Sequence, residues 1–129
     1  MESFDIQTAL MSLGKLQITG ETTTDDAASA MNILGNFNQC MIGVVKFSGL
    51  TPWERHPDDE LLYVLEGEVE VKVLDAEVTH TEIVQAGSVF IVPRNLWHNQ
   101  KSNDGVKLLF ITSKEGNEHS SAEDPPSDR

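Results

Sequence analysis

The middle of the chain, residues 40–112, is a succession of short apolar stretches separated by turn residues. Residues 68–73 alternate charged and apolar side chains at every step, as in a strand with one buried and one wet face. At least six such stretches follow one another every 8–12 residues or so, the spacing of an all-β sandwich or barrel. The predicted strands are 40–47, 61–65, 68–73, 82–84, 89–92 and 106–112, with turns at 66–67, 86–87 and 103–105.

The N-terminal part is less regular. Residues 4–13 predict a short helix that begins after Ser3 and stops at Gly14. Residues 26–34 fit a helix or a strand, and the pattern does not decide between them. We therefore expect residues 1–39 to form an N-terminal extension that packs on a barrel of residues 40–113.

The C-terminal part, residues 114–129, is rich in Ser, Glu, Asp and Pro and has almost no apolar side chain. Such a segment cannot bury enough surface to fold alone, so we expect a flexible acidic tail, disordered or strapped onto the barrel. His119 lies in this tail, and we expect it to be disordered. His80 lies in a polar hairpin region, and we expect it to be exposed.

Length and charge limit the function classes. A chain of 129 residues is one domain's worth, and no apolar run approaches the ~20 residues of a membrane helix. The net charge is −12, without a cluster of Lys or Arg, so nucleic acid and anionic membranes are poor partners. The N-terminus lacks the basic start of a signal peptide, which predicts a cytoplasmic protein. Cys40 has no disulfide partner and is expected in the core.

Imidazole and carboxylate groups occur next to two of the predicted strands. His56 and Glu60 stand directly before the strand 61–65, and His98 follows the strand 89–92 after a short loop. Neutral imidazole combined with carboxylate suits divalent Fe, Mn, Ni, Zn or Co. Two strands of one barrel can bring these groups together, although the spacing alone leaves that open.

The first of these stretches follows a recognisable frame. Glu54-Arg55-His56 is followed by three residues, then Glu60, six residues and Gly67. This frame resembles the first motif of the cupin superfamily, in which His-x-His is followed by Glu and then Gly. The usual first histidine of that motif is Glu54 here.

The second stretch matches the second cupin motif. Gly87, five residues, Pro93-Arg94-Asn95, two residues and His98 occur in that order. Asn95 stands where the motif has a glycine, and it tolerates the same left-handed backbone geometry. The final Asn of the motif is Ser102 here. The two motifs lie in the right order, and the resemblance covers residues 40–112.

The resemblance implies a single cupin barrel, the double-stranded β-helix or jelly roll. It also implies a divalent metal ion held by Glu54, His56, Glu60 and His98, where the usual cupin set is three histidines and one glutamate. Strand alternation puts Gln100 on the side of His98, and Leu62 and Val64 on the side of Glu60, so these three are predicted to line a pocket. Alternation points Trp97 away from His98, which favours packing on the outer face or a dimer contact over a pocket wall.

Three functions are compatible with such a barrel. The first is a metal-dependent enzyme acting on a small organic metabolite, of the dioxygenase, isomerase or lyase type, with Glu54 as fourth ligand or catalytic base. The second is a non-catalytic module that binds a metal or a metabolite. The third is a metal-free, epimerase-like enzyme with His56 as base, although the only tyrosine, Tyr63, points away. Cupin-like single domains are often homodimers, and the apolar segment 6–16 is suited to pairing with a second copy.

Overall fold

Strands make up most of the structure, a computed structural model that describes residues 1–124. Two short helices accompany them, α1 (Ile6–Met11) and α2 (Thr24–Ser29). The strands are β1 (Gln17–Ile18), β2 (Met31–Phe37), β3 (Cys40–Leu50), β4 (Trp53–Arg55), β5 (Glu60–Asp75), β6 (Val78–Gln85), β7 (Val89–Val92), β8 (His98–Ser113) and β9 (Glu118–Ser120).

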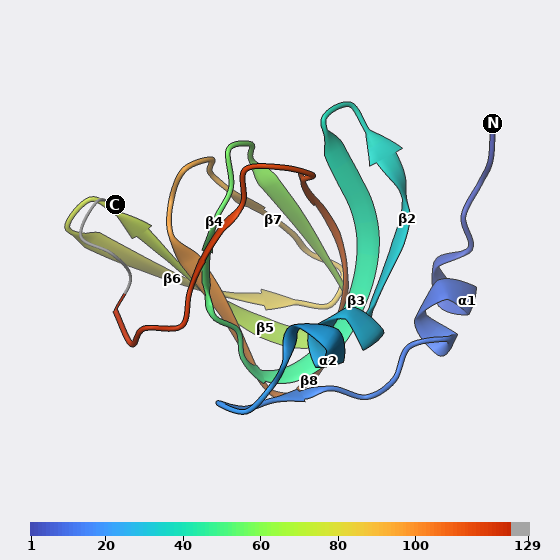
Figure 1. Cartoon of the computed structure of the whole chain (residues 1–129), viewed down its shortest axis with the longest axis horizontal. Coiled ribbons are helices and arrows are strands. Elements are labelled where there is room, and N and C mark those ends of the chain that lie inside the picture. Colours follow the sequence, from blue (N-terminus) through green and yellow to red (C-terminus); the bar gives the residue numbers. More distant parts are fainter. Residues whose placement is uncertain (125–129) are drawn as a thin grey trace.

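The long strand β8 organises the sheet. It pairs antiparallel with β3 along one edge and with β5 along the other. β5 also pairs with β6 and β7, and β2 extends the sheet beyond β3. The strands curl around a common interior, with the helices beside β2 and β3 (Figure 1). This arrangement confirms the all-β barrel predicted from the strand pattern.

The alternation of residues 68–73 has its expected consequence in the core. Val69, Val71 and Val73 are buried, while Glu68 and Lys72 are exposed. The buried valines join an apolar cluster from β3, β5, β6, β7 and β8, whose other members are Phe47, Leu62, Val64, Val84, Val92, Val106, Leu108 and Phe110. One face of β5 therefore builds the interior that holds the barrel together.

The predicted strands 61–65 and 68–73 and the predicted turn at 66–67 belong to one continuous strand, β5. Gly67, predicted as a turn residue, lies where β5 and β8 cross closely: its φ is 82°, and a Cβ there would lie 2.3 Å from the carbonyl oxygen of Gly105. The pairing of β5 with β8 shifts register just after this point. The predicted turn at 103–105 likewise lies within β8, which begins at His98 and not at residue 106. Glycine here allows close backbone approach, and not a hairpin reversal.

The N-terminal residues cover the outer face of the sheet. Helix α1 is shorter than the predicted 4–13, because the side chain of Asp5, and not Ser3, accepts the capping hydrogen bond from the Thr8 backbone N–H. Leu10 and Leu13 pack against Val44 of β3. The segment 26–34, left undecided by its pattern, contains the end of α2 and the start of β2.

Part of the predicted tail is ordered as strand β9, which pairs antiparallel with β4. In Figure 1 this red segment lies against the green β4. The last residues of the predicted tail, 125–129, lie outside the described part of the chain.

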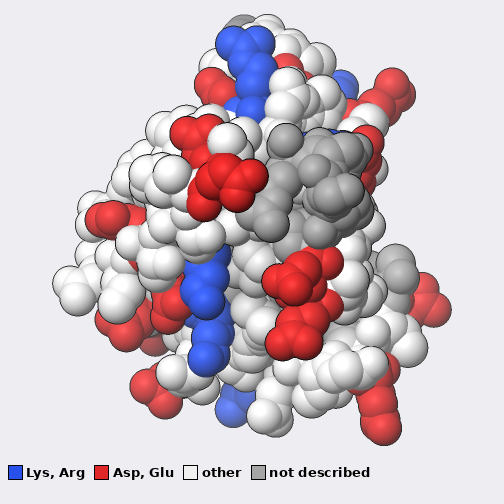
Figure 2. Space-filling model, turned by 90° about the vertical axis from the view of Figure 1, so that its left-hand side faces the viewer, with Lys and Arg blue, Asp and Glu red and all other residues white. Residues whose placement is uncertain are grey.

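Charge is dispersed on the face that Figure 2 shows. Acidic side chains are scattered across it, and the basic ones lie between them without forming one continuous patch. Within residues 1–124, neither helix has the length and apolarity needed to cross a membrane.

Candidate metal centre

Three strands bring the four predicted ligands together. Glu54 in β4 is the register partner of His98 at the start of β8. His56 directly follows the end of β4, and Glu60 opens β5. Ligand atoms of Glu54, His56 and His98 lie within 4.8 Å of one another. The structure thus gathers all four side chains at one place, although they come from separate segments.

The contacts within the cluster join imidazole nitrogens to carboxylate oxygens. His98 Nε2 lies 3.1 Å from Glu60 Oε1. His56 Nε2 lies 3.7 Å from Glu60 Oε2 and 3.5 Å from Glu54 Oε2. A divalent ion about 2.0–2.2 Å from each donor, in tetrahedral or octahedral geometry, separates neighbouring donors by about 2.9–3.6 Å. The observed separations fall in or next to that range.

Both histidines present Nε2 to the cluster and Nδ1 to an acceptor outside it. His98 Nδ1 lies 3.3 Å from the carbonyl oxygen of Leu96, and His56 Nδ1 lies 2.8 Å from Asn117 Oδ1. The Asn117 amide is oriented because its Nδ2 donates to the Ser113 carbonyl oxygen at 2.9 Å. Each Nδ1–H therefore has an acceptor, which leaves Nε2 to face the carboxylates.

One atom tests whether the site suits a metal ion. His56 Nε2 is buried and has no hydrogen-bond partner among the described residues. A buried polar atom left unpaired costs about 1–3 kcal/mol, so such atoms are rare in stable proteins. Once deprotonated, this nitrogen would offer its lone pair to an ion, and the donor set of two imidazoles and two carboxylates suits Fe, Mn, Ni, Zn or Co.

Charges in the metal-free cluster stabilise one another. Burial acts to raise the pKa of Glu54, but the imidazoles of His119 and His56 beside its two oxygens, with the charge of His98, outweigh it and lower the pKa to about 2. Burial acts to lower the pKa of His56, but Glu54, Glu60 and Asn117 together raise it to about 9. The pKa of His119 is raised mainly by its hydrogen bond to Glu54. Glu54 is therefore ionised at neutral pH.

Sequence reasoning missed the contribution of the C-terminal residues. The expected disorder of His119 is wrong, because β9 places its Nε2 3.5 Å from Glu54 Oε1. Glu118 forms an ion pair with Arg55 of β4, and Asn117 contacts His56 as described above. The sole signal in the sequence was the complementary charge of residues 54–55 and 118–119, which is too common to be diagnostic.

The two tryptophans stand beside the ligands without entering the cluster. Trp97 is buried, and the guanidinium carbon of Arg55 lies 4.7 Å from the centre of its ring. Trp53 is partly buried, and its indole Nε1 donates to the Glu123 carbonyl oxygen at 3.1 Å. Cation–π packing of this kind ties β4 to the loop before His98.

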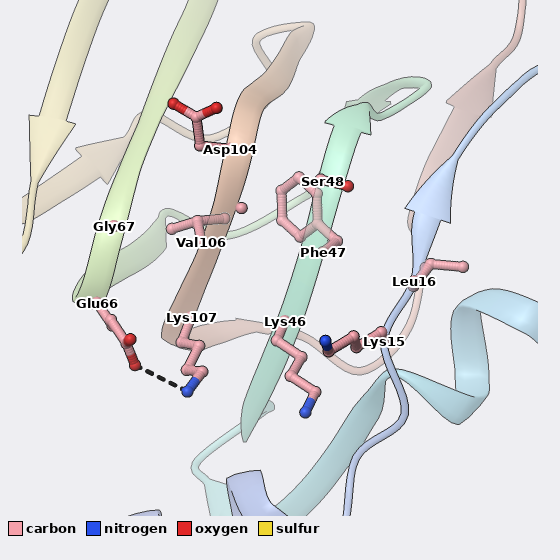
Figure 3. Close-up of a pocket in the computed structure, with 11 residues that line it drawn as sticks. Lys15, Leu16, Lys46, Phe47, Ser48, Glu66, Gly67, Asp104, Val106 and Lys107 are labelled. Carbon is pink, nitrogen blue, oxygen red and sulfur yellow. Dashed lines mark ion pairs between the residues drawn. The ribbon is translucent and has the colours of Figure 1, made fainter.

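The predicted pocket residues are buried in the interior. Leu62 and Val64 belong to the apolar core, and Gln100 is buried with its side-chain oxygen unpaired within the described residues. A surface hollow of about 580 Å³ lies elsewhere, around Gly67 and Gly105. Figure 3 shows Lys15, Lys46 and Lys107 beside this hollow, with Lys107 paired to Glu66. No predicted ligand lines this hollow or a second hollow beside it.

Known proteins resemble the chain in sequence over about half to two thirds of its length. A germin-like protein of Arabidopsis thaliana (subfamily 2, member 4) is 43% identical over 67 residues, which cover 50% of this chain and 30% of the relative. YdbB, an uncharacterized protein of Bacillus subtilis, is 29% identical over 83 residues, which cover 64% of this chain and 71% of the relative. The chain spans about a third of the length of the germin-like relatives it matches.

Solved structures share the fold. Protein NMB1881 from Neisseria meningitidis superposes with a TM-score of 0.67 at 20% identity, covering 88% of this chain and 100% of that one. Hydroquinone 1,2-dioxygenase from Sphingomonas sp. TTNP3, with 4-hydroxybenzoate bound, gives 0.58 at 14% identity, covering 67% and 66%. Oxalate oxidase in complex with the substrate analogue glycolate gives 0.58 at 23% identity, covering 70% and 54%.

A family model confirms the resemblance read from the two motifs. The model described as "Cupin domain" matches residues 43–112, which is more than half of the sequence. These residues contain both motif frames and run from β3 to β8. The chain belongs to the cupin domain family.

Proposed function

We propose that this chain holds one divalent metal ion with Glu54, His56, Glu60 and His98, and acts on a small organic metabolite bound beside the ion. The observation that carries the proposal is the cluster itself, in which two imidazole Nε2 atoms lie 3.1–3.7 Å from the carboxylate oxygens of Glu54 and Glu60. Gathering two imidazoles and two carboxylates at the end of an apolar core costs desolvation free energy, and a bound cation would offset that cost.

Each side chain has a distinct task in this proposal. His98 and His56 supply neutral Nε2 donors, whose orientation is set by the acceptors on their Nδ1 atoms. Glu60, buried beside both imidazoles, supplies an anionic oxygen. When bound, the ion would polarise an oxygen of the ligand as a Lewis acid.

Glu54 can serve as fourth ligand or as general base. Its Oε2 faces His56 Nε2 in the way the other donors face one another, which favours the ligand role. A pKa of about 2 also makes its carboxylate a weak base at neutral pH. We therefore propose that Glu54 is a ligand.

The proposed substrate class rests on similarity of fold. The neighbours include a hydroquinone 1,2-dioxygenase with 4-hydroxybenzoate bound and an oxalate oxidase with glycolate. Both bound molecules are small and carry oxygen groups, which suits a site that pairs a cation with apolar walls. Fold alone does not fix a reaction, so dioxygenase, isomerase and lyase chemistry all remain within the proposal.

A second candidate, a non-catalytic metal- or metabolite-binding module, has an observation in its favour. Leu62 and Val64 lie beside Glu60 on the interior face and are fully buried. The surface hollows around Gly67 and Gly105 are lined by other side chains. An enzyme needs room for a substrate next to the ion, whereas a module that binds only the ion does not.

Metal content distinguishes these proposals from a metal-free barrel. Wild type and His98→Ala would be purified without added metal, and their metal measured by elemental mass spectrometry before and after reconstitution. We expect near one equivalent in wild type and none in the variant. Bound Fe points to oxygen chemistry and bound Zn to hydrolysis or isomerisation. An empty wild type, even after reconstitution, would sink both metal-dependent candidates.

A homodimer and a cytoplasmic location remain part of the proposal. Within the described residues β2 pairs only with β3, and it exposes Met31, Ile33 and Phe37. A strand edge with apolar side chains is suited to pairing with a second copy. Light scattering after gel filtration would show a mass near twice that of the chain if a dimer forms.

A further inference from the structure

We propose that the C-terminal strap, residues 117–120, completes the metal centre by positioning two of its ligands. Asn117 would orient His56, and His119 would orient Glu54. Neither residue lies in the region matched by the cupin model, which ends at residue 112. This inference rests on the proposed metal binding, and it assigns positioning roles to residues outside both motifs.

The contact between Asn117 and His56 is well defined. Asn117 Oδ1 lies 2.8 Å from His56 Nδ1, and Asn117 Nδ2 donates to the Ser113 carbonyl oxygen at 2.9 Å. The second bond decides which end of the amide faces the imidazole, so the oxygen accepts and Nδ1 donates. Nε2 is then the nitrogen that faces the carboxylates, and it is the one that would bind an ion after losing its proton. Acceptors of this kind hold a ligating histidine in one tautomer and one ring orientation.

The contact between His119 and Glu54 is longer and nearer the solvent. His119 Nε2 lies 3.5 Å from Glu54 Oε1, while the other carboxylate oxygen, Oε2, lies 3.5 Å from His56 Nε2. The two histidines therefore hold opposite oxygens of one carboxylate. Removing His119 would remove the contact at Oε1, and the Glu54 side chain could then rotate towards the solvent more easily.

The strap alternates as a strand should. Asn117 and His119 contact the ligands, and Glu118 between them pairs with Arg55, whose guanidinium lies over the buried Trp97. Register pairs of β9 with β4 include His119 with Glu54. The backbone ladder, the ion pair and the two site contacts thus all connect the strap to the same short strand and the residue after it.

The experiment is a Co²⁺ titration followed by visible absorption, which reports affinity and ligand geometry together. Asn117→Leu removes the acceptor without changing side-chain size much, and we expect about 10–100-fold weaker binding and a changed d–d spectrum. Asn117→Asp, which keeps an acceptor oxygen, should recover at least part of the affinity and the wild-type spectrum. His119→Ala should weaken binding several-fold.

Matched controls come from the same chain. Asn103→Leu and His80→Ala alter exposed residues of β8 and β6 and should bind Co²⁺ as wild type does. His119 is 60% exposed at its side chain, so His119→Ala keeps the test valid even if Asn117→Leu fails to fold.

The outcomes separate the two proposals. Wild type that binds no Co²⁺ overturns the metal centre itself, and the positioning roles with it. Wild type that binds, with Asn117→Leu and His119→Ala unchanged in affinity and spectrum, leaves the metal centre standing and overturns the role of the strap.

Discussion

The two halves of the candidate metal centre are built in different ways. Glu60 and His98 form the barrel half: their side chains are 6% and 1% exposed, and they begin β5 and β8, the longest strands of the sheet. Glu54 and His56 form the rim half, on the three-residue β4 and the residue after it. Glu54 is 27% exposed at its side chain.

Different contacts fix the side-chain positions in the two halves. Backbone pairing along β5, β7 and β8 holds the barrel half, together with the apolar core beneath it. The rim half has one register pair with β8, a backbone hydrogen bond from Asn95 to the His56 carbonyl oxygen and the packing of Arg55 on Trp97, and its other contacts come from the strap. Changes to the barrel should therefore cost folding stability, and changes near the rim should mainly cost metal affinity.

Leu62→Ala tests the barrel half, and we expect the largest effect from it. Leu62 is fully buried two residues after Glu60, so the change should lower the free energy of unfolding by about 2–5 kcal/mol. Urea unfolding measures this. A cost below about 1 kcal/mol would indicate that Leu62 lines a hydrated pocket, as first predicted, and not a packed core.

The ligands themselves allow a direct comparison of the halves. Glu60→Gln and Glu54→Gln each remove one anionic donor at nearly constant size. We expect Glu60→Gln to weaken metal binding at least 100-fold or so, more than the 10–100-fold typical of groups outside a ligand set. Glu54→Gln should cost less, because this side chain is more exposed. Calorimetric titration measures both, and equal losses would contradict the division into two halves.

The pH dependence of stability should differ between the metal-free and the metal-loaded protein. The pKa of His56 is raised from its ordinary 6.5 to about 9, so its stabilising contribution is fully present below pH 6.5 and is lost as pH rises through 9. The melting temperature of chelator-treated protein should therefore fall between pH 6.5 and 9.

The metal-loaded protein should behave differently over the same pH range, because deprotonated ligands bind the ion more tightly as pH rises. Thermal scans of both forms at each pH make the comparison. An identical pH dependence with and without metal would mean that His56 does not bind the ion.

Glu118→Gln should have the smallest effect. The change removes the ion pair between Glu118 and Arg55. Because the Glu118 side chain is more than half exposed, we expect a stability loss of about 0.2–1 kcal/mol that shrinks in high salt. Metal affinity should fall less than in Asn117→Leu. A larger loss of affinity than in that variant would show that Glu118, and not Asn117, secures the strap.

Motif spacing named all four candidate ligands, Glu54 and His56 of the rim half as well as Glu60 and His98 of the barrel half, and strand patterns described the barrel around them. Pattern reasoning found the strand that carries Glu60 and the residue His98, because buried strands have an apolar signature and the motif frames have fixed spacing. It also separated buried Leu62 and Val64 from the other face of their strand. These features depend on near neighbours in the sequence.

The rim half depends on contacts that the local pattern does not encode. β4 and β9 have three residues each, too few for a periodicity to be detected, and β9 carries no apolar side chain. The reversal that brings residues 117–120 back to β4 includes Gly116, with a φ of 81°, packed against Pro57. Gly67 was misread for the related reason that a close strand crossing and a turn favour the same residue.

The position of the strap has a consequence for how this site can diverge over evolutionary time. Asn117 and His119 follow the matched region of residues 43–112 and add little to the apolar core, so substitution there leaves the barrel and both motifs intact. On the proposed role of the strap, descendants of one ancestral gene can keep every motif residue and still differ in how tightly they retain a metal. Inheritance of the motifs and inheritance of the metal affinity are separable in such a chain.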